Sequence, residues 1–351
     1  MHCLVANGVY NTMIYLLFEA FIQAGRSNIY ELFEGYLARW SWPRKHHSAH
    51  LPSIFSKSRA KSHRSAKHIK CQASDLLAIF PVLAYFVQVI LLPIGLCTHE
   101  CNAFLAASNV LDFISSANRG KITSDMITTA VESFLELFVS VWGEAKLIPK
   151  MHWLLHFRRY FERYGLLIAC FVTERYHRNP KRYATDMTNT NKSASKTVLK
   201  EVVCLMMSRV QSPNAFNFSV GLVQSRPASK NVRAAVFFHL EMADDGTYDV
   251  DSAFESRFNR FGTCKKGDVV LFDNDGALMA AKVLLHVEVA GTPLSLVSVW
   301  VLKSIDRDAG YSEWHSSFNP QIFDTGDIVD TVVTSELGDN TTALLLPCDF
   351  R

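Results

Sequence analysis

Residues 150–182 are where cationic, imidazole and aromatic side chains are most densely mixed in this sequence. The eight Lys/Arg residues of this stretch stand against only two carboxylates, Glu162 and Glu174. Clustered cations are suited to phosphate contact. Glu174 follows an apolar run, residues 166–172, which fits a buried strand or a short core helix. Among arginines, this carboxylate is a candidate metal ligand, but without partner aspartates an ion-pair network is the favoured interpretation.

Cysteine and histidine residues near this stretch raise the question of a zinc site. Cys97 and Cys101 flank His99, and His152 and His156 stand four residues apart, on one helical face. A tetrahedral zinc ion could draw on both groups. The spacing does not form a Cys-x-x-Cys pair, so we expect core cysteines and predict no metal site.

A second basic segment, residues 43–74, contains no acidic residue. Its Ser and Pro residues predict a flexible linker, which either contacts a polyanion or is only solvated. If it contacts nucleic acid, the cations of both segments would bind phosphate, because counterion release needs no defined geometry. The predicted phosphate-binding residues are Arg44, Lys45, Lys57, Arg59, Lys61, Arg64, Lys67, Lys70, Arg158, Arg159, Arg175, Arg178, Lys181 and Arg182.

The charge is distributed unevenly along the 351 residues. Residues 1–240 hold 28 Lys/Arg and 14 Asp/Glu, and residues 241–351 hold 8 and 19. The acidic part is therefore expected to repel nucleic acid and to bind a basic protein partner or the first part of the chain. Eight scattered cysteines and the lack of a recognisable signal peptide predict a nuclear or cytoplasmic protein.

The elements that position these residues are predicted to be helices first and strands later. Three- and four-residue apolar spacings predict a helical hairpin in residues 1–42 and a helical domain in residues 75–210. Within that domain, the 21 uncharged residues from Leu76 to Leu96 could span a bilayer. Pro81, Gln88 and Pro93 favour a buried core helix, and a membrane anchor is the alternative.

After a linker in residues 211–232, the pattern changes to short apolar runs separated by turns. Runs at Val236–Phe238 and Val269–Phe272, and a turn at Asn274-Asp275-Gly276, predict an acidic, SH3-like antiparallel β-barrel in residues 233–335, followed by a tail in residues 336–351. Tyr311, Trp300 and Trp314 would either line a peptide groove or fill the core. The predicted fold class is α+β.

In this order of elements the chain resembles the C-terminal part of CACTA (En/Spm)-type DNA transposases. The resemblance rests on Lys150, His152 and His156, on the apolar run 166–172, and on Thr173-Glu174-Arg175, where Thr173 departs from the family pattern. It implies an RNase H-like core whose three carboxylates bind two Mg²⁺ ions. Glu174 would be the last of the three, but the first 74 residues contain no aspartate and no predicted sheet.

The expected function is therefore that of a truncated, transposon-derived protein that binds nucleic acid or chromatin without catalysis and needs no cofactor. An Mg²⁺-dependent nuclease or strand transferase using Glu174 is the first alternative. A membrane-anchored protein is the second.

Overall fold

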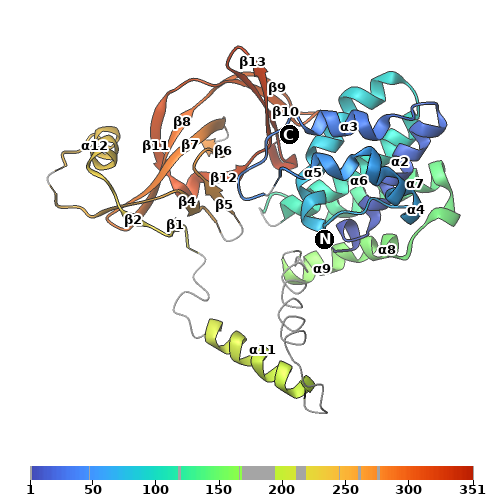
Figure 1. The fold of residues 1–351 in the computed structure, drawn as a ribbon, viewed down its shortest axis with the longest axis horizontal. Coiled ribbons are helices and arrows are strands. Elements are labelled where there is room, and N and C mark those ends of the chain that lie inside the picture. Colours follow the sequence, from blue (N-terminus) through green and yellow to red (C-terminus); the bar gives the residue numbers. More distant parts are fainter. Residues whose placement is uncertain are drawn as a thin grey trace.

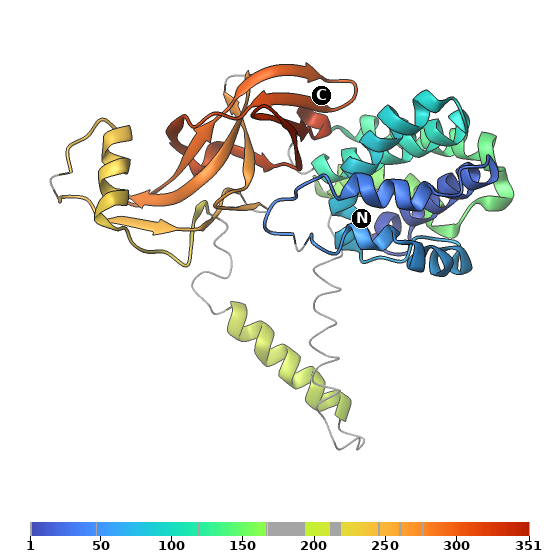
Figure 2. The same ribbon diagram turned by 45° about the horizontal axis from the view of Figure 1, so that its top comes forward.

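The computed structural model describes residues 2–46, 48–117, 120–165, 167, 194–210, 219–244, 246–259, 262–274 and 277–350. Helices form an N-terminal body, and antiparallel strands form a C-terminal body beside it (Figures 1 and 2). The predicted α+β class, with helices before strands, is confirmed.

The N-terminal body is built from helices whose apolar faces meet in one core. They are α1 His2–Val5, α2 Val9–Gln23, α3 Ile29–Leu37, η1 Pro52–Phe55, α4 Lys57–Ala66, α5 Ala73–Phe86, η2 Val87–Leu91, η3 Leu92–Ile94, α6 Thr98–Ser116, α7 Ser124–Trp142, η5 Glu144–Lys146, α8 Pro149–His152, η6 Trp153–His156 and α9 Phe157–Tyr164. Two further helices are α11 Ala194–Val210 and α12 Lys230–His239. The Thr123 hydroxyl caps α7 by accepting a hydrogen bond from the Met126 amide, at 3.2 Å.

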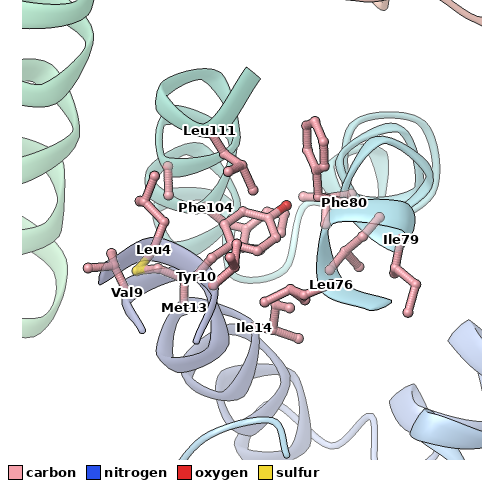
Figure 3. Packing of buried hydrophobic residues seen from close by; sticks show 14 of the residues in the cluster. Leu4, Val9, Tyr10, Met13, Ile14, Leu76, Ile79, Phe80, Phe104 and Leu111 are labelled. Carbon is pink, nitrogen blue, oxygen red and sulfur yellow. The ribbon is translucent and has the colours of Figure 1, made fainter. Parts of the chain in front are cut away.

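Aromatic side chains fill the centre of the helical body. Tyr10 of α2 lies between Phe80 of α5 and Phe104 of α6, with ring centroids 6.4 and 5.2 Å away (Figure 3). Its buried hydroxyl is paired with the Ser108 hydroxyl at 2.9 Å. This bond satisfies a polar group that would otherwise be costly to bury.

The C-terminal body consists of three antiparallel sheets. The strands are β1 Gly221–Val223, β2 Arg226–Pro227, β3 Val250–Ala253, β4 Glu255–Arg257, β5 Thr263–Lys265, β6 Val269–Asn274, β7 Ala277–Val289, β8 Thr292–Val299, β9 Val301–Asp306, β10 Tyr311–His315, β11 Pro320–Asp324, β12 Ile328–Thr331, β13 Thr334–Gly338 and β14 Thr341–Leu345, with short helices η7 Thr325–Asp327 and η8 Cys348–Phe350. The sheet orders are β1-β4-β5, β13-β14-β10-β9 and β11-β8-β7-β3-β2, with β6 pairing both β7 and β12.

The described strands do not close into a barrel, so the structure supports antiparallel sheets but not the predicted SH3-like detail. The predicted hairpin is present, because β6 and β7 pair up to Asn274 and Ala277. The run Val236–Phe238 is not a strand, since it belongs to α12. The predicted tail contains the end of β13, all of β14 and η8, and the predicted linker at 211–232 contains β1, β2 and the start of α12.

The basic segment 43–74 also differs from the predicted flexible linker. It forms η1 and α4, and Ile54, Phe55 and Ile69 are buried in the core of the helical body. The His63 ring is buried between two backbone groups: Nε2 lies 2.7 Å from the Ile54 carbonyl oxygen, and Nδ1 lies 3.0 Å from the Lys70 amide nitrogen. Together with the buried Leu51, these side chains anchor at irregular spacing a segment whose composition is mostly polar.

The two bodies are joined through the segment that follows α3. Ser41 and Thr334 exchange two backbone hydrogen bonds of 2.7 and 2.9 Å, which attach this segment to the edge strand β13. Tyr85 of α5 stacks on Tyr311 of β10, with ring centroids 4.9 Å apart. Ala343 and Leu345 of β14 belong to the same buried cluster as the helices. The sheet therefore helps to complete the helical core.

Two segments of the described chain are long and apolar enough to cross a membrane, by length and composition alone. They are Cys3–Gln23 and Ala73–Ile94, and 56% and 44% of their most apolar windows are buried inside the protein. Both also serve as packed helices of the N-terminal body. The expected core position of α5 is thus observed, while the membrane alternative stays a prediction.

Candidate nucleic-acid interface

Helix α4 presents four of the fourteen predicted phosphate-binding residues on a defined scaffold, namely Lys57, Arg59, Lys61 and Arg64. His63 is its buried residue, and this side chain fixes which side of the helix faces the core. Burial lowers the pKa of His63, so the ring stays neutral. The charged side chains of α4 consequently point towards solvent.

Some of these cations are already paired. Arg64 Nε donates to Glu19 Oε1 at 2.9 Å, and Lys57 lies 3.5 Å from Glu31. Arg59 Nη2 donates to the carbonyl oxygen of Lys70 at 2.8 Å. These interactions make the three side chains less available to an external anion, although ion pairs at exposed positions are weak.

Three lysines differ from Lys57, Arg59 and Arg64 because no side-chain hydrogen bond or ion pair is found for them in the described part of the chain. Lys61, Lys67 and Lys70 are all exposed. The bonds of Lys70 to His63 and Arg59 hold it beside α4, and Lys67 is the C-cap of that helix. We refer to Lys61, Lys67 and Lys70 as the α4 lysine cluster.

The second predicted basic surface lies on α9. Arg158 is neutralised by Glu162 at 2.8 Å and Asp125 at 3.1 Å, and these carboxylates raise the pKa of its guanidinium. Arg159 is exposed, and it too has no carboxylate partner among the described residues. Of the two predicted phosphate-binding residues on α9, Arg158 and Arg159, it is therefore Arg159 that is available to phosphate.

Both basic surfaces are attached to the corner between α1 and α2. Lys150 Nζ donates to the carbonyl oxygens of Ala6 and Asn7, at 2.7 and 3.0 Å, which holds α8 there. The Asn11 amide donates to the Ile69 carbonyl oxygen at 2.8 Å, which holds the end of the α4 segment there. In Figure 1, α4, α8 and α9 run along the lower part of the helical body. The structure thus brings together segments that are far apart in sequence.

Arg44 and Lys45 lie elsewhere, at the junction with the sheets. The Arg44 amide donates to Asp268 Oδ1 at 2.7 Å. A Cβ at Gly267, whose φ is +91°, would lie 2.9 Å from Arg44 Nη2, so the glycine makes room for the guanidinium. Glu174, Arg175, Arg178, Lys181 and Arg182 lie outside the described residues.

A cavity of about 580 Å³ opens beside Arg44. Trp42, Trp300 and the strongly exposed Phe318 line it together with Lys282. Trp300 therefore borders a groove, whereas Trp314 is 1% exposed and fills the core. Both tryptophans belong to one buried cluster of the sheets, so both fill the core, and the peptide groove stays a prediction.

The zinc arrangement considered from the sequence does not form around the cysteines. No group of three or more His, Cys, Asp or Glu residues with metal-binding geometry is found among the described residues. Burial raises the pKa of Cys101 to about 12, which disfavours the thiolate needed for ligation. His152 and His156 do approach each other, with 3.3 Å between their Nε2 atoms.

A buried polar chain in the sheets was not predicted. Cys264 Sγ lies 3.6 Å from His286 Nε2, His286 Nδ1 lies 2.8 Å from the Ser295 hydroxyl, and that hydroxyl lies 2.9 Å from Thr325 Oγ1. Burial raises the pKa of Cys264 to about 12 and lowers that of His286 to about 4. Both groups are neutral and closed to solvent, so this Cys–His pair is not an activated nucleophile. The sequence pattern of β7 gave no signal for it, because His286 shares its phase with the exposed Lys282 and with Glu288.

No family model, curated protein or solved structure matches this chain.

Proposed function

We propose that this chain is a transposon-derived protein that binds nucleic acid through the α4 lysine cluster and Arg159, without cutting it. One observation carries the proposal: four exposed cations on a rigid scaffold have no carboxylate partner in the described part of the chain. Unpaired cations release counterions from phosphate without first breaking an internal ion pair. Contacts of this kind bind the backbone and do not read base sequence.

The size of the expected effect follows from the number of cations. Four phosphate contacts give a slope of log K against log salt of about −3.6, so that affinity for a duplex falls on the order of a hundredfold between 50 and 200 mM salt. Replacing Lys61, Lys67 and Lys70 with alanine leaves one contact and makes the slope about −0.9. Fluorescence anisotropy with a labelled duplex measures both quantities.

A matched control variant also removes three positive charges, but from the sheet body. Lys230, Lys266 and Lys303 are exposed there, and their triple alanine variant should keep the wild-type slope. Equal losses in both triple variants would show that binding depends only on net charge. Wild-type affinity that does not respond to salt would contradict the proposal outright.

The nuclease alternative predicts Mg²⁺-dependent nicking that disappears in Glu174→Gln. The two functions separate cleanly, since the α4 lysine variant tests binding and the Glu174 variant tests cleavage. Persistent nicking in Glu174→Gln would remove this residue from the chemistry.

A further inference from the structure

The histidine pair on α8 and η6 has a geometry that the nucleic-acid proposal does not use. His152 ends α8 and His156 ends η6, so the two residues lie four apart on one continuous helical run. Both side chains are exposed. Their rings are nearly perpendicular, at 84°, with centroids 4.9 Å apart and Nε2 atoms 3.3 Å apart.

This separation equals that of two nitrogens bound to one tetrahedral metal ion. With Zn–N bonds of about 2.0–2.1 Å and a tetrahedral angle, two ligand nitrogens lie about 3.3–3.4 Å apart. Without a metal, one of the two Nε2 atoms must carry a proton and donate it to the other. A bound cation accepts a lone pair from each Nε2, and the ring that had donated then carries its proton on Nδ1.

We propose that His152 and His156 bind one divalent transition-metal ion of the zinc, nickel or copper class. Imidazole nitrogen is a preferred ligand of these ions. No third His, Cys, Asp or Glu joins the pair among the described residues, so water or an external ligand completes the coordination. Arg159, three positions beyond His156, opposes the dication and favours an anionic external ligand. The site is therefore open, and it is weaker than a structural zinc centre.

Calorimetric titration of the full chain with zinc chloride tests this directly. The wild type should bind one zinc ion through the pair, and His152→Ala or His156→Ala should each weaken that event at least about tenfold, because each removes one of two ligands. His99→Ala is the matched control, since it removes another exposed histidine, located between Cys97 and Cys101, and should leave binding unchanged. Circular dichroism melting shows whether each variant is folded.

Cobalt(II) absorption provides a second measurement, because it distinguishes nitrogen and oxygen ligands from thiolates. The proposal requires a cobalt spectrum without a thiolate charge-transfer band and its loss in the double variant. A thiolate band at this site, absence of zinc binding by the wild type, or unchanged zinc binding by the double variant would overturn it. Duplex affinity without metal tests the α4 lysine cluster separately.

Discussion

The buried chain of Cys264, His286, Ser295 and Thr325 shows how a single residue can make folding depend on pH. His286 is fully buried in β7, with its two ring nitrogens facing Cys264 and Ser295. No carboxylate contacts the ring in these bonds. Protonation of His286 therefore places an uncompensated charge among neutral groups, which is costly.

Lowering the pH should destabilise the protein through this residue. The pKa of His286 is about 4 in the folded protein and 6.5 for an ordinary histidine, so the unfolded chain binds the proton more tightly. The contribution of neutral His286 to the free energy of unfolding is complete above pH 6.5. It is lost as the pH falls to about 4, and the total is on the order of 3 kcal/mol. Urea unfolding at several pH values measures it.

The quantity that tests this prediction is the slope of the free energy of unfolding against pH, because a variant can change stability at one pH for other reasons. His286→Gln removes one titrating group and should reduce the slope between pH 6.5 and 4, whatever its effect at neutral pH. A smaller slope should remain, because burial also lowers the pKa of His63 and that of His46. His99→Gln, on an exposed position, should keep the wild-type slope. An unchanged slope in His286→Gln would contradict the assigned origin.

Sequence composition identified the cationic residues but not which of them are free. Arg64 and Lys57 are paired with Glu19 and Glu31, which come from earlier helices. Residue spacing along the chain does not contain such partnerships, because they depend on how helices pack. The α4 lysine cluster is thus a subset that only the tertiary structure defines.

At the scale of elements, α3 illustrates what an apolar pattern predicts well. Tyr30, Phe33 and Leu37 recur at three- and four-residue spacings, and all three are buried. Phe33 contacts Phe18, Phe55 and Phe86, with ring centroids 6.0, 4.6 and 5.1 Å away. One helical face thus joins α2, η1 and α5.

Truncation of Phe33 should be among the most damaging changes in the helical body. Phe33→Ala is expected to lower the free energy of unfolding by about 3–5 kcal/mol, since it removes a fully buried ring and leaves a cavity. The adjacent Leu32 is 44% exposed, and Leu32→Ala should cost less than about 1 kcal/mol. Equal losses in the two variants, measured by chemical denaturation, would contradict this packing.

The elements that the sequence pattern missed have a common physical cause. Segment 43–74 is mostly polar, yet Ile54, Phe55 and His63 anchor it, and tertiary burial of a few side chains outweighs average composition. Val236–Phe238 has strand-forming residues, but Ser229 caps a helix there, and its hydroxyl accepts from the Val232 amide at 3.4 Å. Short apolar runs do not distinguish a helix from a strand.

At the scale of the whole molecule, β14 belongs to two layers at once. It lies between β13 and β10 in its sheet, and its Ala343 and Leu345 are part of the buried cluster of the helices. The sequence predicted separate bodies with a C-terminal tail, because non-local pairing leaves no local pattern. The interface combines these apolar contacts with an ion pair between Lys121 and Asp273, at 3.4 Å.

Removal of residues 336–351 should therefore abolish stable folding of both bodies. The deletion takes away a central strand and part of the helical core, so the helices should lose their cooperative thermal transition. Leu337→Ala, which changes a 51%-exposed side chain in the same segment, should melt close to the wild type. A deletion variant with a wild-type melting transition would show that β14 is dispensable.

The position of β14 also has a consequence for biosynthesis. A ribosome releases α2 and α5 long before β14, yet these helices share their buried cluster with it. The cluster around their most apolar segments, Cys3–Gln23 and Ala73–Ile94, is therefore complete only once β14 has been synthesised. During that interval the nascent chain presents apolar helices to the translation machinery and to chaperones.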